Sequence, residues 1–358
     1  MRAFYQHLEQ SLLECGEVVL ATAIQPQSCC FGAPPAGNGS LDGRCQVSQA
    51  LYIKGQLFPQ QEALRSFWEQ RFLALDVSSL PQLVLIHNYM VVFERIRTRP
   101  RLVICGGGHI AQPLAQLGSM LDFGVTVIDD RAEFVNEARF PTADVRIQCP
   151  FANALDTLAF DEHMYFVIIT RGHQYDRLCL ETILRHPFAY VGMIGSRQKV
   201  ALVMEQLQQT GFSAELLAQV HAPIGLRIGA QTPAELAVCI AAELVQVRSQ
   251  RPCASFPAGA FEQLQQDEPL AMATILSKDG SAPRGCGARM LLNREGKLCG
   301  SIGGGPAEAR AIQAADILLQ GEKNAACLLE CEMNNTDAQQ AGMTCGGKLL
   351  VLVQALSE

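Results

Sequence analysis

The sequence predicts an α/β protein in which a doubly wound parallel sheet is flanked by two smaller α/β modules. Three observations lead to this fold class. Residues 102–128 read as strand, glycine-rich turn, helix and strand; apolar runs of strand length follow at 165–170 and 190–194; and glycine-rich loops alternate with strands and a helix after residue 267. Apolar runs of strand length separated by helical segments are typical of a parallel sheet covered by helices on both faces.

Composition indicates a folded protein with more than one domain. The 358 residues exceed the size of a typical domain, so we expect two or three domains. Hydrophobic residues make up 49% of the chain and charged residues 18%, which is enough apolar surface for a sizeable core. The formal net charge of -7 and the lack of a long Lys/Arg run argue against nucleic acid as a partner. No apolar run reaches the length of a membrane span and the first 20 residues are acidic and amphipathic, so we expect a cytoplasmic protein that binds no membrane.

The 14 cysteines do not have the spacing of a metal site. Cys29 and Cys30 are adjacent, Cys327 and Cys331 are four residues apart, and no CxxC pair occurs. We therefore expect no metal site and expect most of the thiols to be reduced and buried.

Residues 102–129 read as a complete βαβ unit. A strand at 102–105 leads into G-x-G-x-x-A at 106–111, a helical pattern follows, and a second strand ends at Asp129. This is the Rossmann fingerprint for a dinucleotide, with the acid about 20 residues after the glycines, where it would hold a ribose hydroxyl. Asp129 favours NAD, whereas Arg131 leaves NADP open. The alternative is a Rossmann-like fold with a degenerate nucleotide site.

The predicted nucleotide-binding residues follow the carboxyl ends of the predicted strands, where ligands of open α/β sheets collect. After the first two strands they are Gly106, Gly107, Gly108, His109, Ile110, Asp129, Asp130 and Arg131. After the strands that end near 170 and 194 they are Thr170, Arg171, His173, Asp176, Gly195, Ser196, Arg197 and Lys199.

Two groups among these residues indicate a specific chemistry. His173 with Asp176 would make an acid–base pair. Ser196, with two cations at a helix start, would bind a phosphate. The alternatives are a surface histidine and an ordinary capped helix start, and the sequence assigns no catalytic residue.

The nucleotide-binding domain is expected to cover residues 98–250. Thr232, Pro233 and Glu235 form a near capping box for a helix that closes this domain near residue 248, and a Pro- and Gly-containing linker follows at 249–260. The C-terminal module, 261–358, carries three glycine-rich loops on strands and a helix. Its candidate binding residues are Ser281, Arg284, Gly303, Gly304, Gly305, Glu308, Cys345 and Gly346.

Residues 1–97 read as a degenerate copy of the C-terminal module. The matching segments are VVLATAI (18–24) with LAMATIL (270–276), YIKGQLFPQQEALRSF (52–67) with KLCGSIGGGPAEARAI (297–312) when one residue is gapped, and NYMVVFERI (88–96) with GKLLVLVQAL (347–356). In this alignment Phe58, Pro59 and Gln60 stand where the C-terminal copy has three glycines. Chance similarity of strand and helix patterns is the alternative. We expect the two modules to pack together or to play equivalent roles across a dimer.

These motifs resemble the XdhC/CoxI family, accessory proteins that mature xanthine dehydrogenase and related molybdenum hydroxylases. PRLVICGGGHIAQPLAQLG, GVTVIDDRAEFVNEARFPTADV, YVGMIGSRQK and PIGLRIGAQTPAELAVCIAAEL look like the Rossmann domain of that family, over about 100–248. GSAPRGCGARMLL, GSIGGGPAEA and MTCGG look like its second domain.

The resemblance implies a protein that binds molybdenum cofactor of the molybdopterin type, protects it, and assists its sulfuration and its insertion into the hydroxylase. The implied partners are a cysteine desulfurase and the apo form of a hydroxylase of the xanthine dehydrogenase type, and we expect a homodimer. The chain departs from the family pattern at two positions. Pro306 stands where a cysteine is common, and Arg171 stands where the strand-end motif usually has histidine. Cys345 is then the motif cysteine that remains in the C-terminal module.

Two other functions fit the same residues. One is an NAD(P)-dependent oxidoreductase that acts on a small substrate, based on the glycine fingerprint and on His173 with Asp176. The other is a partner-binding protein whose two cofactor sites have both decayed, based on Pro306 and on the eroded N-terminal copy.

Overall fold

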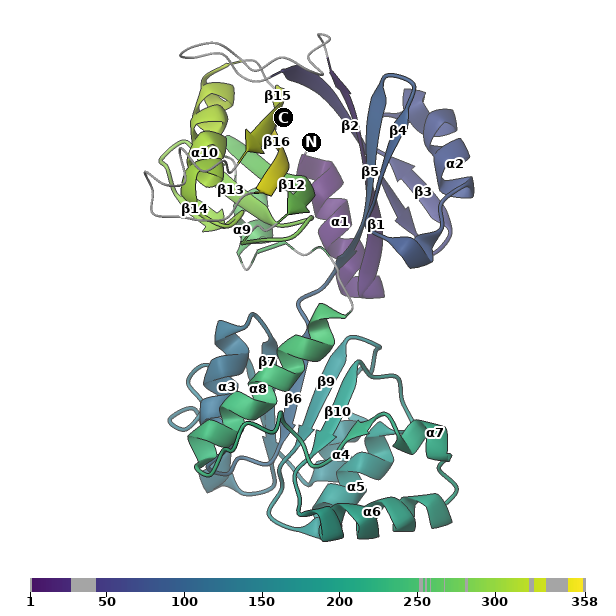
Figure 1. The fold of residues 1–358 in the computed structure, drawn as a ribbon, viewed down its shortest axis with the longest axis vertical. Helices are drawn as coiled ribbons and strands as arrows, with labels where there is room; N and C mark the ends of the chain where they lie inside the picture. The colour runs from purple at the N-terminus through teal and green to yellow at the C-terminus, as the bar shows by residue number, and fades with distance from the viewer. Residues whose placement is uncertain are drawn as a thin grey trace. The chain divides into compact units, whose positions relative to one another are not determined.

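The chain forms two compact units in the computed structural model (Figure 1). The model describes residues 2–26, 43–250, 254, 256–257, 259–266, 268–280, 283–321, 325–332 and 347–356. The first unit combines Met1–Thr98 with Cys253–Glu358, and the second unit is Arg99–Pro252. The two modules expected at 1–97 and 261–358 therefore lie in one unit. Within the described residues, no helix is both long and apolar enough to span a membrane.

The second unit contains a six-stranded parallel sheet in the order β11-β10-β9-β6-β7-β8. Its strands are β6 (Arg101–Cys105), β7 (Gly124–Asp129), β8 (Val145–Gln148), β9 (Met164–Ile168), β10 (Tyr190–Met193) and β11 (Val220–His221). The direction of the strand order reverses between β6 and β9, as in doubly wound nucleotide-binding folds. The predicted α/β fold class with a Rossmann-like parallel sheet is confirmed.

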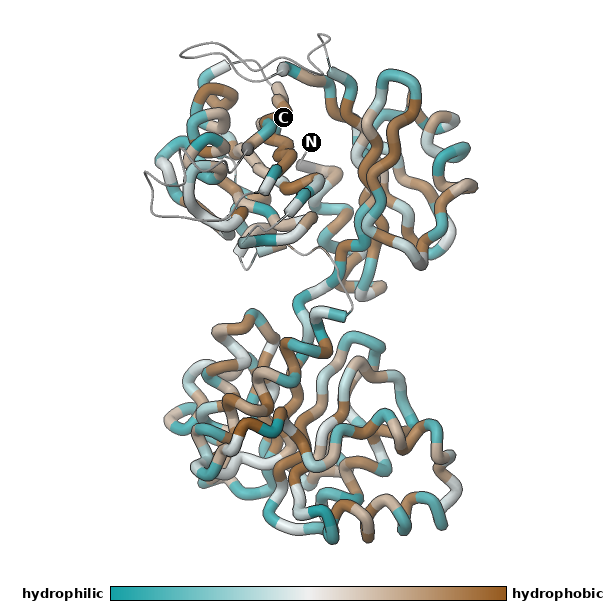
Figure 2. Tube along the Cα trace, in the orientation of Figure 1, coloured by the Kyte–Doolittle hydropathy of each residue, from teal (hydrophilic) through white to brown (hydrophobic). Residues whose placement is uncertain are grey.

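Helices cover both faces of this sheet because successive strand residues point to opposite sides. The helices are α3 (Ala111–Met120), α4 (Phe151–Asp156), α5 (His173–Ile183), α6 (Arg197–Gln209), α7 (Ala214–Leu217) and α8 (Pro233–Ser249). Leu102 and Ile104 pack with α3 and α8, whereas Val103 and Cys105 pack with α4, α5 and α6. The hydropathy colouring of Figure 2 follows this arrangement, with brown segments along the strands. The predicted capping box of α8, between Thr232 and Glu235, is present.

The first unit contains a ten-stranded sheet in the order β14-β13-β12-β16-β15-β2-β1-β5-β4, with β3 paired to β2. Its N-terminal half consists of α1 (Arg2–Cys15), β1 (Glu17–Pro26), β2 (Arg44–Ile53), β3 (Gln56–Pro59), α2 (Arg65–Leu73), β4 (Gln82–Ile86) and β5 (Tyr89–Arg97). Its C-terminal half consists of α9 (Ala260–Gln265), β12 (Leu270–Gly280), β13 (Arg289–Asn293), β14 (Leu298–Gly300), α10 (Gly305–Gln320), β15 (Ala326–Glu332) and β16 (Gly347–Leu356).

The two halves repeat one topology. The N-terminal strands lie in the order β3-β2-β1-β5-β4, and the C-terminal strands in the matching order β14-β13-β12-β16-β15. Each half also has one helix before its first strand and one between its third and fourth strands. Strand register agrees with two of the expected matches, 18–24 with 270–276 and 88–96 with 347–356, since Thr22 pairs with Val92 as Thr274 pairs with Leu352. The repeat is therefore a feature of the fold and not a chance similarity.

The remaining expected match, 52–67 with 297–312, is in the wrong register. Phe58 pairs with Leu51 in the way that Cys299 pairs with Leu291, so Phe58 corresponds to Cys299 and not to Gly303. Strand pairing fixes the register of β3 against β14. The two halves therefore differ in length in the loop that follows these strands and leads to α2 or α10. A short 3-10 turn at Glu62–Leu64 follows β3 in the N-terminal half, and it contains no glycine.

Three apolar layers hold the first unit together. The inner core joins both halves and contains α1 and α9, through residues such as Tyr5, Leu8, Phe256 and Leu264. On the opposite faces of the strands, α2 covers the N-terminal half and α10 covers the C-terminal half. A strand connection adds to this packing, because β15 pairs with β2.

A buried polar cluster lies on the inner face and links the two halves. Arg289 donates a hydrogen bond to Glu94, with 2.6 Å between Nη2 and Oε2, and both side chains are buried. Tyr5 donates to Gln49 over 3.0 Å and accepts from Gln354 over 2.9 Å. By strand register Glu94 is equivalent to Gln354, and Arg289 is equivalent to Gln49. The repeat therefore relates an ion pair between the two halves to a pair of neutral side chains between the same halves.

Candidate functional site

The candidate site lies at the carboxyl edge of the parallel sheet, between the loops that follow β6 and β9. Gly106 has a φ of +116°, and a Cβ added there would lie 2.4 Å from the carbonyl oxygen of Ile169. Only glycine lets these two loops approach so closely. The reversal of strand order therefore coincides with a tight backbone contact.

Three consecutive main-chain amides precede helix α3. Within the described part of the chain, the N–H groups of Gly108, His109 and Ile110 donate no hydrogen bond. A Cβ added at Gly108 would have no atom within 4 Å, so the space beside this loop is open. Unpaired amides at the positive end of a helix dipole are a binding site for an anion. We call Gly108, His109 and Ile110 the amide cradle.

The carboxylate of Asp129 is already saturated with donors. Its Oδ2 accepts from Gly107 N at 2.8 Å and from Arg131 Nη2 at 3.0 Å. Its Oδ1 accepts from Arg131 N at 3.1 Å and from Arg131 Nε at 2.9 Å. Burial raises the pKa of Asp129, but the hydrogen bonds from Arg131 and Gly107 outweigh it and lower the pKa below its ordinary value. A ribose at Asp129 would have to displace Arg131.

The segment after Asp129 packs directly on the glycine loop. The Arg131 guanidinium lies 3.6 Å from the centre of the Phe134 ring. A Cβ added at Gly107 would lie 2.0 Å from the carbonyl oxygen of Phe134. Arg139 donates to the carbonyl oxygen of Gly107 over 3.0 Å, and its guanidinium lies 5.1 Å from the centre of the Phe134 ring. Phe134 and Arg139 were not among the predicted site residues, although both lie in the segment GVTVIDDRAEFVNEARFPTADV that resembles the family.

NAD binding remains a prediction from the sequence. If the site accepts NAD, replacing Arg131 by alanine is expected to strengthen that binding about tenfold, because the variant frees carboxylate oxygens for the ribose hydroxyls. Titration calorimetry of the two proteins with NAD measures the change. Arg139→Ala is the matched control, since it removes a cation from the same ring without touching Asp129. Equal or weaker NAD binding by Arg131→Ala, relative to this control, would contradict the expectation.

An ion pair crosses the glycine loop. Arg171, after β9, donates to both carboxylate oxygens of Asp130, after β7, over 3.1 and 2.9 Å. It also donates to the Tyr175 hydroxyl over 2.9 Å. Since β6 lies between β7 and β9, this pair spans the mouth of the loop that β6 leads into. Both side chains are partly exposed, so the pair is weak and can open for a ligand.

Asp176 pairs with Lys199 and not with His173. Its side chain is fully buried and accepts from Thr170 Oγ1 at 2.6 Å and from Lys199 Nζ at 2.6 Å. His173 is exposed and has no polar partner among the described residues. The expected acid–base pair of His173 with Asp176 is therefore wrong. Both residues lie in the first turn of α5, but Asp176 points inward toward Thr170 in the loop after β9 and Lys199 in α6, which supply the donors.

At the start of α6, where we expected a phosphate site, Ser196 and Lys199 already form hydrogen bonds within the protein. Ser196 is the N-cap of α6, and its Oγ accepts from Lys199 N at 3.3 Å. Lys199 is engaged with Asp176, and a Cβ added at Gly195 would lie 3.3 Å from the Lys199 side chain. Arg197 is exposed at the same helix start. Ser196 and Lys199 therefore agree with the alternative given for this segment, an ordinary capped helix start, rather than with a phosphate site.

The triple-glycine loop of the C-terminal half binds the carboxylate of Glu308, a residue of the same chain. Glu308 Oε2 accepts from Ser301 Oγ at 2.6 Å, from Ile302 N at 3.0 Å and from Gly304 N at 3.1 Å, and Gly303 N donates to Ser301 Oγ over 3.0 Å. Burial raises the pKa of Glu308, but the donors of Ser301 and the loop amides outweigh it and lower the pKa below its ordinary value. The amides of Ile302 and Gly304 therefore hold a carboxylate of the same chain.

The glycines of this loop are required by its backbone. Gly303, Gly304 and Gly305 have φ values of +116°, +72° and +67°, and Pro306 lies in the first turn of α10. Arg284 packs on Gly303, where an added Cβ would lie 3.4 Å from Arg284 N. Ser281, Cys345 and Gly346 lie outside the described residues.

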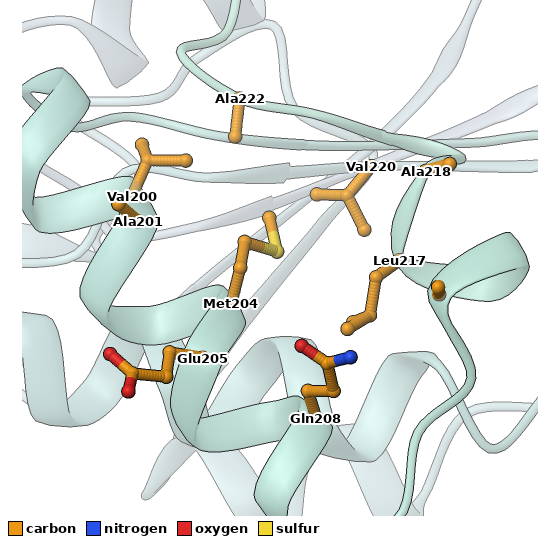
Figure 3. Close-up of a pocket in the computed structure, with 10 residues that line it drawn as sticks. Val200, Ala201, Met204, Glu205, Gln208, Leu217, Ala218, Val220 and Ala222 are labelled. Carbon is orange, nitrogen blue, oxygen red and sulfur yellow. The ribbon is translucent and has the colours of Figure 1, made fainter.

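An open pocket of about 480 Å³ lies elsewhere in the second unit, among α6, α7 and β11 (Figure 3). Its lining is mainly apolar, and the Met204 side chain extends into it between Leu217 and Val200. None of the residues that the sequence singled out lines this pocket.

Two family models match the chain. Residues 102–244 match the XdhC Rossmann domain, and residues 263–330 match the XdhC and CoxI family. Over 155 residues the chain is 36% identical to the uncharacterized protein YqeB of Escherichia coli (strain K12) and 30% identical to a probable xanthine dehydrogenase subunit of Bacillus subtilis (strain 168). These matches cover 43% of this chain but only 28% and 45% of the two relatives. The chain thus spans less than half the length of either relative.

A solved structure gives a similar fold. The crystal structure described as a xanthine dehydrogenase from Bacillus halodurans matches with a TM-score of 0.51 and 22% identity. The match covers 69% of this chain and 67% of that chain. At this identity the likeness concerns the fold alone.

Proposed function

Because the chain belongs to the XdhC and CoxI family, we propose that it is an accessory protein in the maturation of a molybdenum hydroxylase of the xanthine dehydrogenase type. The family models match both units and together cover more than half of the chain. The finer proposal is that the protein binds molybdenum cofactor, of the molybdopterin type, as its cargo. Its partners are then the apo-hydroxylase that receives the cofactor and a cysteine desulfurase.

The amide cradle is the observation that carries cofactor binding. The cofactor bears a phosphate group. At the N-terminal end of α3, three amides donate no hydrogen bond within the described ranges of the chain, and such amides are a site for an anion. The open space beside Gly108 leaves room for a large ligand. Nearby Arg171 is partly exposed and is held by an ion pair with Asp130 and by contacts with the hydroxyl and ring of Tyr175, so it is available to the ligand.

The triple-glycine loop does not fit a phosphate. Glu308 occupies the amides of Ile302 and Gly304, and its negative charge would repel a second anion. We therefore assign the phosphate to the amide cradle rather than to the C-terminal loop. Pro306 has no thiol, so we assign the supply of sulfur to the desulfurase partner.

Gly108→Val tests this assignment. The expected result is at least about tenfold weaker retention of molybdenum cofactor with an unchanged Tm, because a side chain here fills the open side of the cradle without meeting protein atoms. The purified proteins are incubated anaerobically with the cofactor and gel-filtered, and co-eluting molybdenum and pterin are measured.

Gly285→Val is the matched control. Gly285 also has no atom within 4 Å of an added Cβ, and it follows Arg284 in the C-terminal half. If Gly285→Val loses the cofactor while Gly108→Val retains it, the cofactor binds in the C-terminal half and the assignment to the cradle is wrong. If the wild-type protein retains no cofactor, the proposal of cofactor binding fails.

The NAD(P)-dependent oxidoreductase is less well supported than this proposal. The acid–base pair on which it depended is not formed, and Asp129 is engaged with Arg131. Nucleotide binding without turnover in a substrate screen would agree with the maturation role.

A further inference from the structure

Strand β4 is an uncovered edge of the ten-stranded sheet. It is the last strand in the sheet order and pairs only with β5, through five consecutive residue pairs without a bulge. Within the described residues, β4 has no neighbouring strand on its other side, and Leu83, Val84 and Leu85 make no main-chain hydrogen bond outside the sheet. The main-chain donors and acceptors on the outer side of β4 therefore have no partner in the part of the chain that the structure describes.

The side chains of this edge are apolar. Leu83, Val84 and Leu85 are 38%, 37% and 67% exposed, and β4 contains no charged residue. Soluble proteins usually protect such edges with lysine, proline within the strand, a bulge or a covering segment. The edge strand at the opposite end of the sheet, β14, has only three residues and is a much poorer template.

The repeat shows how this edge is used in the other half. Strand β15 occupies the position of β4 in the C-terminal half, and its outer edge is covered by β2. The pairing joins Ala326 to Cys45 and Cys327 to Arg44. The same edge of the same module therefore already accepts an added antiparallel strand within this chain.

A second copy of β4 fits the edge. Two β4 strands related by a twofold axis at Val84 would run antiparallel, so every unpaired donor of one would face an acceptor of the other. Val84 would face Val84, and Leu83 would face Leu85 of the second copy. Because the strand is uncharged, no like charges would meet across the pair. A charged or bulged partner strand would gain less from these three side chains.

We propose that the protein is a homodimer joined by antiparallel pairing of β4 with β4 of a second copy. A twofold contact of this kind uses the free edge of both copies, so assembly stops at two chains. The proposal is independent of cofactor binding and of the role in hydroxylase maturation.

Leu85→Lys in the full chain tests the dimer. The wild-type protein is expected to sediment as a dimer, and the variant to dissociate at least about tenfold more readily, because a lysine in each copy replaces an apolar cross-strand contact. Met120→Lys is the control, since Met120 is 81% exposed and lies on α3 in the other unit. Circular dichroism and Tm show that both variants fold. A monomeric wild type, or a Leu85→Lys dimer as stable as the control, overturns the proposal.

Val84→Cys tests the register. Opposed residues of an antiparallel pair have Cβ atoms about 4.5–5.5 Å apart, close enough for a disulfide after a small shift. Mild oxidation should therefore link two Val84→Cys chains, and non-reducing electrophoresis should show a dimer band that the wild type lacks. Leu13→Cys, at a residue that is 78% exposed on α1, should give no such band. A Val84→Cys dimer that remains unlinked rules out a twofold axis at Val84.

Discussion

Replacing Arg289 by methionine should lower the free energy of unfolding of the first unit by about 3–5 kcal/mol. Both Arg289 and Glu94 are 3% exposed, and the guanidinium is the cation hydrogen-bonded to the Glu94 carboxylate. Among the described residues, the other carboxylate oxygen of Glu94 has no hydrogen-bond partner. Without Arg289, a negative charge would remain in the inner core with no compensation.

The double variant Arg289→Met with Glu94→Met separates this effect from a loss of packing. Removing both charges should restore most of the lost free energy, since a buried ion pair and an apolar pair of similar volume are close in stability. Gln49→Met, at the position equivalent to Arg289, removes only neutral hydrogen bonds and should cost about 1 kcal/mol. Urea unfolding of the full chain, followed by a probe in the first unit, gives these values. If Arg289→Met alone were as stable as the double variant, the charge of Glu94 would have to be compensated by another group.

Gly107→Ala should destabilise the second unit by about 3 kcal/mol or more. The added Cβ would lie 2.0 Å from the Phe134 carbonyl oxygen and 2.9 Å from the carbonyl carbon, so main-chain atoms have to move. That movement would also disturb the hydrogen bond from Gly107 N to Asp129. The expected result is a lower Tm and faster amide exchange in α3 and β7.

Gly108→Ala provides the control for this prediction. It adds the same methyl group one residue further along, where no atom lies within 4 Å. Its Tm should equal that of the wild type. Equal stability of Gly107→Ala and Gly108→Ala would contradict the close contact between the glycine loop and Phe134.

Much of the fold could be predicted from the sequence because apolar periodicity and glycine positions are local signals. The βαβ unit that ends at Asp129, the helix capped by Thr232 and the repeat between 18–24 and 270–276 are all found in the structure. The segment from β3 to α2 was misaligned with its C-terminal counterpart, since the sequence alone does not show in which loop the two copies of the repeat differ in length. The pairing of β3 with β2 and of β14 with β13 shows that they differ in the loop after these strands.

Partners within the candidate site could not be predicted in the same way. The sequence places His173, Asp176 and Lys199 at one sheet edge, but the inward rotamer of Asp176 decides that Lys199 is its partner. Likewise Glu308 lies near its own loop in any alignment, yet only the left-handed backbone at 303–305 turns the loop amides toward the carboxylate. Such choices depend on distances of about 3 Å, which residue order does not fix.

The order of the chain through the two units has a consequence for synthesis. The second unit is inserted between the two halves of the first, and the segments that enter and leave it are hydrogen-bonded to each other, with Arg97 N donating to Ala254 O and Ala254 N to Arg95 O. All the residues of the parallel sheet have been made by residue 252, so this unit can fold while the ribosome is still translating. The N-terminal half must wait with an exposed inner face until β16, the last strand, has left the exit tunnel. In a nascent chain arrested before that point, the parallel-sheet unit would be folded while the first unit would still be incomplete. Chaperones that bind apolar strands would be expected to recognise the incomplete first unit.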